Sequence, residues 1–177
     1  MNGTERLPSG IAIQNARPHD APAILSLYPR AFPGEDLRPL VTTLIAGDVP
    51  VLSLVAMRAD AVVGHALFTR FEDGRAALLG PLGVAPEEQR TGIGTALIAK
   101  GLRRLSETGT GHVFVLGDPN YYVRCGFTPE TRVRPPYDLP EEWLGAWQSL
   151  TLGDAEPLAS ARCRLPAPWM EPRYWAP

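Results

Sequence analysis

The sequence has little cysteine and no long apolar run. Its 177 residues include two cysteines, Cys125 and Cys163. Two thiols are too few for a disulfide framework or the usual structural zinc site, which favours a reducing compartment. No apolar run approaches the roughly 18 residues of a membrane span. The opening MNGTERLPSG has no signal-peptide pattern. We therefore expect a cytoplasmic protein with no membrane partner.

The sequence also lacks a dominant charge. Lys and Arg number 17 and Asp and Glu 19, giving a net charge of -2. No basic field covers the whole chain, so we expect no nucleic-acid partner, and any anion site must be local. The hydrophobic share of 45% and charged share of 20% are ordinary for a soluble globular protein. The length fits one domain over residues 1–177.

Hydrophobic periodicity predicts strands and helices in alternation, hence a mixed α/β (α+β) domain. We expect Asp20 to cap the first helix and Pro29 to end or kink it. Pro39 should weaken the second helix. The expected strands are 11–17, 51–58, 61–72, 76–86 and 112–117, with late candidates at 147–152 and 161–165; the expected helices are 18–32, 34–47, about 91–109 and 118–125.

The strand expected at 76–86 is interrupted by Gly80, Pro81 and Gly83. Proline cannot donate to a strand ladder, and glycine weakens a strand and often marks a bulge. We therefore expect this strand not to stay fully paired.

The stretch QRTGIGTA, residues 89–96, follows that strand and opens a helix. The first N–H groups of a helix lack intrahelical partners and carry roughly half a positive charge. Glycines there allow a phosphate to approach the backbone. The spacing fits neither a P-loop nor a dinucleotide-binding fingerprint. Taken alone, the glycines also fit a simple strand-to-helix turn.

Gln89-x-x-Gly92-x-Gly94 resembles the acyl-CoA motif of the GNAT superfamily of N-acetyltransferases. The stretch VFVLGDPNYYVRCGF, residues 113–127, is similar to the next strand and tyrosine-bearing helix of that superfamily. The resemblance implies a mostly antiparallel sheet flanked by helices and splayed between its fourth and fifth strands. It places the core motifs in 76–127 and leaves 128–177 as an irregular C-terminal part.

The resemblance also implies acetyl-CoA as the acyl donor and no metal. The pantetheine arm would pair with the strand backbone, and the diphosphate would lie on the following loop and helix start. Tyr122 would be the general acid that protonates the departing thiolate, with Tyr121 or a structural role for both tyrosines as alternatives. The expected cofactor-binding residues are Leu82, Gly83, Val84, Gln89, Arg90, Thr91, Gly92, Ile93, Gly94 and Thr95.

The general base is not evident from the sequence. Glu35 and Asp36 fit either a substrate pocket or a loop at a helix start. His65 fits a hydrogen-bonded structural residue better than a base, and His112 is expected to be exposed. Water can also accept the amine proton. The tryptophans of the C-terminal third either shape an acceptor pocket or fill core: Trp143, Trp147, Trp169 and Trp175.

The resulting hypothesis is an N-acetyltransferase that acts on a primary amine of a small molecule or a protein, by direct attack in a ternary complex. The alternative is a catalytically silent acyl-CoA or CoA sensor of the same fold. The sequence leaves open the acceptor and the choice between monomer and homodimer.

Overall fold

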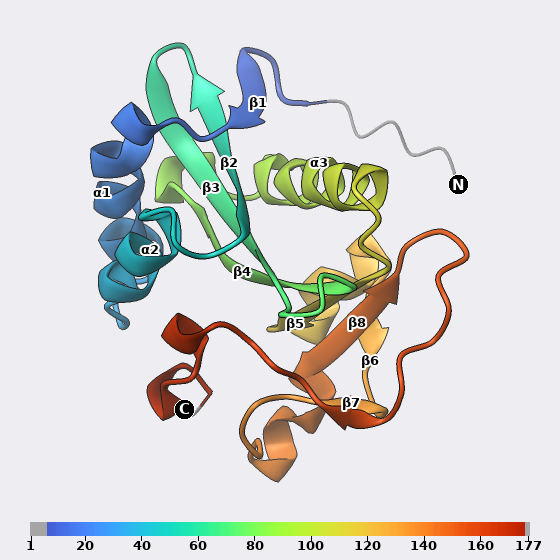
Figure 1. Cartoon of the computed structure of the whole chain (residues 1–177). Helices are drawn as coiled ribbons and strands as arrows, with labels where there is room; N and C mark the ends of the chain where they lie inside the picture. The colour runs from blue at the N-terminus through green and yellow to red at the C-terminus, as the bar shows by residue number, and fades with distance from the viewer. Residues whose placement is uncertain (1–6, 176–177) are drawn as a thin grey trace. The chain divides into compact units, whose positions relative to one another are not determined.

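The computed structural model describes residues 7–175 (Figure 1). Its strands are β1 (Ile11–Asn15), β2 (Val51–Arg58), β3 (Ala61–Arg70), β4 (Ala76–Val84), β5 (His112–Leu116), β6 (Thr128–Pro129), β7 (Val133–Arg134), β8 (Trp147–Thr151) and β9 (Ala161–Arg162). Its α-helices are α1 (Ala21–Ala31), α2 (Arg38–Ile45), α3 (Ile93–Glu107) and α4 (Pro119–Tyr122). Short 3-10 turns are η1 (Pro18–Asp20), η2 (Pro86–Glu88), η3 (Val123–Cys125), η4 (Glu141–Ala146), η5 (Ala167–Trp169) and η6 (Pro172–Tyr174).

Seven strands form one mixed sheet in the order β1-β2-β3-β4-β5-β8-β6, and β7 pairs with β9 separately. The pairs β1–β2, β5–β8 and β6–β8 are antiparallel, whereas β4–β5 is parallel. The predicted fold class, a mostly antiparallel sheet flanked by helices, is confirmed.

The predicted splay between β4 and β5 is visible in their register. Pairing runs from Ala76 opposite His112 to Leu79 opposite Val115 and then stops. The next residue, Gly80, has φ 153°, a conformation that L side chains rarely adopt. Pro81 follows and has no N–H to donate. The glycine and the proline therefore end the parallel ladder partway along β4.

The chain forms two compact units, and each is described by itself. The first unit contains the chain up to Leu67 together with Pro81–Gly101. The second contains Phe68–Gly80 together with the chain from Leu102 onward. Three elements, β3, β4 and α3, run from one unit into the other.

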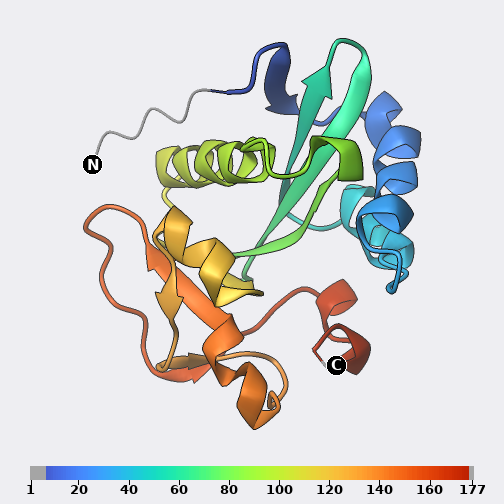
Figure 2. The same ribbon diagram turned by 180° about the vertical axis from the view of Figure 1, so that it is seen from behind.

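In the first unit, helices cover both faces of the strands (Figures 1 and 2). Neighbouring strand residues point to opposite faces. Gly64 faces Ile93 and Leu97 of α3, whereas His65 faces Tyr28 of α1. The buried apolar side chains of α1, α2 and β2 close one side of this core: Ile24, Leu27, Leu40, Val41, Leu44 and Val55.

In the second unit, aromatic rings supply much of the core. Phe114 stacks on Phe71 and Trp147, with ring centroids 5.3 and 5.4 Å apart. Trp175 contacts Trp147 and Trp169 edge-on, at 5.9 and 6.1 Å. Such contacts add stabilisation beyond the area they bury. We call Phe71, Phe114, Trp147, Trp169 and Trp175 the aromatic cluster.

The two prolines of the N-terminal helices behave differently from the prediction. α1 continues through Pro29 and ends at Ala31, and the N–H of Phe32 still donates to the carbonyl of Tyr28 at 2.8 Å. α2 begins only at Arg38, so Pro39 lies in its first turn. A missing N–H costs nothing there, and Pro39 helps to start the helix rather than weakening it.

Two further local predictions also need correction. Asp20 occupies the N-cap position of α1, but its carboxylate accepts from the N–H of Arg17 at 2.7 Å and makes no cap hydrogen bond to α1. His112 is buried rather than exposed. Its Nε2 lies 2.9 Å from the carbonyl oxygen of Glu156, because the segment after β8 covers this end of β5.

Candidate functional site

The loop after β4 is tied to the end of that strand by side chains. The Gln89 side-chain amide donates to the carbonyl of Val84 at 3.1 Å. The Thr91 hydroxyl donates to the carbonyl of Glu88 at 2.6 Å. Two of the predicted cofactor-binding side chains thus hold the loop conformation instead of projecting freely into solvent.

Two arginines hold the turn η2 that precedes this loop. Arg30 of α1 donates to both carboxylate oxygens of Glu87, at 2.6 and 2.7 Å. Arg58 of β2 contacts both oxygens of Glu88, with Nη2 and Oε2 2.8 Å apart. A backbone hydrogen bond and Arg30 lower the pKa of Glu87, and Arg58 lowers the pKa of Glu88. Both carboxylates therefore stay charged, and both pairs persist at neutral pH.

The backbone from Arg90 to Thr95 has an unusual conformation at two positions. Arg90 and Gly92 both have positive φ, 61° and 93°. The first helical amide bond that the structure records here runs from Ala96 to the carbonyl of Gly92. Within the described part of the chain, no N–H of residues 90–95 donates to a protein acceptor. A run of amides at a helix start, free of protein acceptors, fits a diphosphate.

The start of α3 is held close to β3 by Gly64. A Cβ placed on Gly64 would lie 3.0 Å from Cγ2 of Ile93 and 3.1 Å from Cδ1 of Leu97. Both helix residues are buried. The absence of a side chain at Gly64 therefore lets the amide-bearing turn sit directly on the strand.

The last third of β4 packs beneath α1. A Cβ on Gly83 would lie 3.5 Å from both Ala31 Cβ and Tyr28 Cε1. Gly83 is buried, whereas Leu82 and Val84 on either side are half-buried. The backbone of this predicted pantetheine-binding stretch is thus fixed by the helix above it.

A chain of hydrogen bonds crosses the core of the first unit. Ser53 Oγ lies 2.9 Å from Nε2 of His65, and His65 Nδ1 lies 2.7 Å from the Tyr28 hydroxyl. That hydroxyl donates to the carbonyl of Pro81 at 3.3 Å. Burial lowers the pKa of His65 to about 3 and raises that of Tyr28. His65 is therefore a neutral, hydrogen-bonded core residue and is unsuited to act as a base.

In the second unit, Tyr122 ends the short helix α4. The Asp118 carboxylate caps this helix by accepting from the N–H of Asn120 at 2.9 Å, and Gly126 closes the following turn with φ 90°. They fix the position of Tyr122 relative to the end of β5.

The Tyr122 ring is packed on several sides. It meets Tyr121 and Phe127 edge-on, with centroids 5.0 and 5.7 Å apart. A Cβ on Gly117 would lie 2.5 Å from Cε2 of Tyr122, so only glycine fits there. Burial, with smaller effects from Tyr121, Cys125 and Asp118, raises the pKa of Tyr122. The hydroxyl keeps its proton at neutral pH, as a general acid must.

The candidate bases of the N-terminal loop are exposed. Glu35 has an exposed side chain, and its backbone N–H donates to the carbonyl of Phe32 at 3.2 Å. Asp36 is also exposed and pairs with Arg38 at 2.8 Å.

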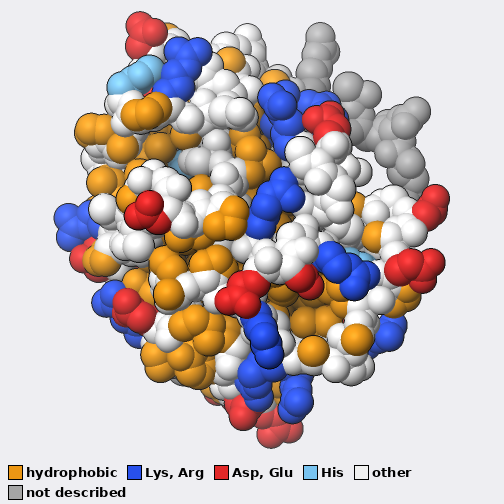
Figure 3. Space-filling model, viewed as in Figure 1, with side chains coloured by type: hydrophobic (Ala, Val, Ile, Leu, Met, Phe, Trp, Pro, Cys, Tyr) orange, Lys and Arg blue, Asp and Glu red, His pale blue; other side chains and the backbone are white. Residues whose placement is uncertain are grey.

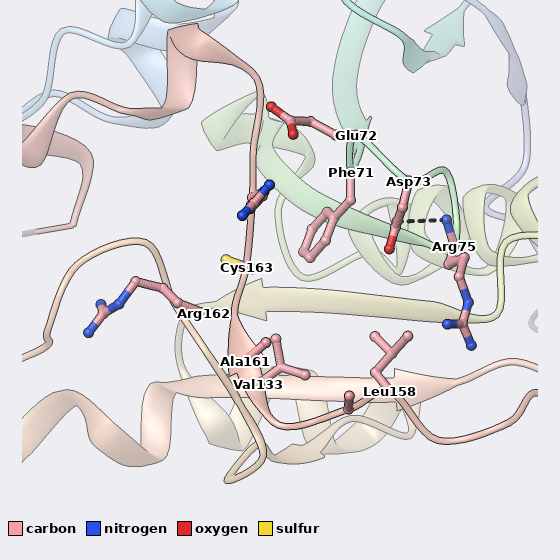
Figure 4. Close-up of a pocket in the computed structure, with 11 residues that line it drawn as sticks. Phe71, Glu72, Asp73, Arg75, Val133, Leu158, Ala161, Arg162 and Cys163 are labelled. Atoms are coloured by element: carbon pink, nitrogen blue, oxygen red, sulfur yellow. Dashed lines mark hydrogen bonds between the residues drawn. The ribbon is translucent and has the colours of Figure 1, made fainter.

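The second unit also has an open pocket of about 370 Å³ (Figure 4). Figure 3 shows a hollow with a hydrophobic floor bordered by charged side chains on the lower right of the molecular face. Arg162 points away from the cavity and donates to Asp138 at 2.6 Å. None of the predicted site residues lines it. The lining residues are Phe71, Glu72, Asp73, Arg75, Val133, Leu158, Ala159, Ala161, Arg162, Cys163 and Arg164.

The structure brings the predicted cofactor-binding residues together in the first unit and places Tyr122 in the second. Sequence reasoning missed Gly64 and Gly117, although a glycine within a strand or at its end is a signal of close approach. It also missed Arg30 and Arg58, since ion pairs between distant segments leave no local pattern.

Two further properties of residues 7–175 bear on the site. None of the helices there is long and apolar enough to cross a bilayer. The same residues contain no cluster of three or more His, Cys, Asp or Glu side chains able to hold a metal ion.

Comparison with known proteins agrees with this fold. The model of the Acetyltransferase (GNAT) family matches residues 21–127. An uncharacterized N-acetyltransferase of Escherichia coli K12, YjhQ, is 37% identical over 160 residues, which cover 83% of this chain and 88% of the relative.

Solved structures show the same similarity. YhbS from Escherichia coli, a GNAT family N-acetyltransferase in complex with CoA, superposes with a TM-score of 0.84 at 28% identity, covering 93% of this chain and 94% of the other. A GNAT acetyltransferase from Brucella melitensis with acetyl-CoA gives 0.72 at 29% identity, covering 89% and 97%. The chain belongs to the GNAT family of acetyltransferases.

Proposed function

We propose that this protein transfers the acetyl group of acetyl-CoA to a primary amine of a small molecule or a protein. GNAT enzymes are acetyl-CoA-dependent acyltransferases, so family membership supports the reaction type. The run of backbone amides from Arg90 to Thr95, none donating to a described protein acceptor, carries the proposal for this chain. Its positive φ angles at Arg90 and Gly92 fit a loop shaped for an anion.

The proposed cofactor site follows the backbone. The diphosphate of acetyl-CoA would bind the amides from Arg90 to Thr95 at the positive end of α3, with Gln89 holding the loop on β4. The pantetheine amides would pair with the backbone of Leu82–Val84 in the manner of an added strand. The arginine–glutamate pairs at η2 and the close contact at Gly64 fix the positions of these two backbone stretches.

The proposed reaction is a direct transfer. The amine nitrogen attacks the thioester carbonyl carbon, and the carbon–sulfur bond breaks with its electron pair on sulfur. The Tyr122 hydroxyl then gives its proton to the thiolate and regains one from solvent. The Tyr122 hydroxyl is protonated at neutral pH, as the proton donor in this step must be.

The proton lost by the amine goes to water in this proposal. His65 is neutral and its ring nitrogens are occupied by Tyr28 and Ser53. Glu35 and Asp36 lie on an exposed loop, where solvent reaches them freely. A base is therefore supplied by solvent or by the acceptor itself.

The wider setting remains a proposal. We propose a single catalytic domain over residues 1–177, because β3, β4 and α3 each run through both compact units. We further propose a cytoplasmic protein that acts as a monomer or a homodimer on an amine acceptor, with no nucleic-acid or membrane partner.

The testing experiment is a thermal-unfolding scan with acetyl-CoA, CoA and NAD. A ligand at about 100 times its Kd adds roughly 2.7 kcal/mol, a shift of roughly 5–10 °C for a chain of this size. We expect the shift with both CoA species and none with NAD. Absence of a shift with CoA contradicts the proposal.

A matched pair of glycine variants sharpens this test. Gly92 and Gly74 both have positive φ, 93° and 69°, and open space around the Cβ position. Valine is strained at both sites, but only Gly92 lies in the amide run. We expect Gly92→Val to lose most of the CoA shift and Gly74→Val to keep it. A normal shift without CoA release across a panel of primary amines would support the silent CoA-binding alternative.

A further inference from the structure

Trp169 lies against the point where β4 and β5 separate. Gly80 is the first residue after the last paired position, Leu79. A Cβ placed on Gly80 would lie 3.5 Å from Cη2 of Trp169, so the ring is in van der Waals contact with the glycine position. Trp169 itself is 7% exposed. The indole therefore fills the space over the vertex of the splay.

Trp169 is held by hydrogen bonds at its ring and at its backbone. Its Nε1–H donates to the Thr69 hydroxyl of β3 at 2.9 Å, and its backbone carbonyl accepts from Nε1 of Trp175 at 2.8 Å. The next carbonyl, that of Met170, accepts from the Tyr137 hydroxyl at 2.6 Å. These bonds hold the ring in one position beside the point where β4 and β5 separate. Trp169 is therefore a fixed part of the structure and not a mobile lid.

Trp169 and Tyr122 approach the end of β5 from opposite faces. The ring of Tyr122 reaches the Cβ position of Gly117, which shares a face with Val115. Within the aromatic cluster, Trp169 contacts Trp175, Trp175 contacts Trp147, and Trp147 stacks on Phe114. Phe114 and Val115 are consecutive strand residues and so point to opposite faces. The proposed acid therefore lies on one face and the indole on the other.

We propose that Trp169 sets the acyl-chain length that the enzyme accepts. The inference rests on the proposed acetyl transfer, in which the thioester lies at the β4–β5 splay. With the sulfur on the Tyr122 side, the acyl group points toward the Trp169 side. An acetyl methyl is short enough to end at the ring, whereas the added methylenes of butyryl or hexanoyl need the volume that the ring fills. Trp169 is thus a specificity-determining residue and has no part in proton transfer.

Calorimetric titration with CoA, acetyl-CoA, butyryl-CoA and hexanoyl-CoA tests the proposal and needs no acceptor. We expect wild-type protein to bind acetyl-CoA more tightly than the longer species. Each methylene newly accommodated in an apolar site is worth roughly a fourfold gain in affinity. Trp169→Leu should therefore improve hexanoyl-CoA relative to acetyl-CoA by about tenfold or more. Trp169→Phe, which keeps an aromatic ring, should give a smaller gain.

The control is Trp143→Leu, which removes a tryptophan of the same unit from the turn η4. It should leave the ratio of the two affinities unchanged. Equal affinity of wild type for acetyl- and hexanoyl-CoA overturns the inference while leaving CoA binding, and so the proposed function, intact. A wild-type preference for acetyl-CoA that both Trp169 variants retain also overturns it. Failure to bind any CoA species removes the proposed function itself.

Discussion

The two compact units satisfy their buried polar groups in different ways. In the first, one continuous chain from Ser53 through His65 and Tyr28 to the carbonyl of Pro81 links four regular elements, β2, β3, α1 and β4. In the second, separate indole N–H groups each anchor one irregular segment. Trp147 donates to the carbonyl of Val133 at 2.7 Å, for example, and Trp169 to Thr69 at 2.9 Å.

The difference follows from the amount of regular secondary structure in each unit. The first unit packs helices on strands, whose backbone groups are already paired, so its side-chain hydrogen bonds can fix β4 beneath α1. The second unit has long stretches without regular structure. A tryptophan there both fills core volume and supplies a donor for a loop carbonyl or hydroxyl.

The largest expected effect concerns the chemistry assigned to the second unit. Tyr122→Phe keeps the ring packing against Phe127 and removes the acidic proton. We expect kcat to fall about 100-fold or more with the Kd for CoA unchanged. The rate is measured as thiol release with an active amine, and the Kd by titration. An unchanged rate would remove Tyr122 from the mechanism.

Gly117→Ala tests the same role without replacing Tyr122. The new Cβ would lie 2.5 Å from the ring, so the tyrosine must move. We expect the rate to fall while CoA affinity is kept. Gly145→Ala, with open space at its Cβ position, is the control. Equal rates for both variants would show that the position of the ring is unimportant.

An intermediate effect is expected at the packing of α3 in the first unit. Gly64→Val would force side-chain atoms into Ile93, Leu97 and Ala56. Overpacking of this kind costs about 1–3 kcal/mol, and it displaces the amide-bearing turn. We expect lower stability in denaturant titrations and weaker CoA binding.

Gly34→Val is the matched control for this position, because Gly34 has open space around it and an ordinary backbone. It should change neither stability nor CoA affinity appreciably. Normal CoA affinity in a folded Gly64→Val protein would show that the placement of α3 on β3 does not matter for the cofactor.

The last expected effect concerns the pH dependence of stability. His65 titrates near 6.5 when exposed and at about 3 in the folded protein. Between these values the unfolded state binds the extra proton. The contribution of His65 is therefore lost as the pH falls from about 6.5 toward 3, by up to about 1.4 kcal/mol per pH unit.

The variant His65→Gln should remove that part of the slope when unfolding free energies are compared between pH 7 and pH 4. The exposed His19 provides the control, and His19→Gln should keep the wild-type slope. Identical slopes for wild type and His65→Gln would mean that the imidazole is not held neutral in the core.

Much of the first unit was predictable from local patterns. The apolar runs at 51–58 and 61–72 predicted strands, and the glycine and proline residues of β4 predicted its broken pairing. The prolines were harder to judge, because Pro29 lies inside α1 and Pro39 inside the first turn of α2. Their effect depends on where each helix begins, and periodicity fixes that boundary poorly.

The sequence by itself determined the order of strands and helices, the amide-bearing turn at 89–96 and the tyrosine helix before Gly126, because each depends on neighbours within a few residues. Only the tertiary structure decided that Trp169 meets Gly80, that Gly117 makes room for Tyr122 and that His65 lies neutral between Tyr28 and Ser53. These contacts join residues from separate elements, or place a side chain over a backbone turn. Such contacts arise when apolar surfaces pack and buried polar groups find partners, and no local spacing records them.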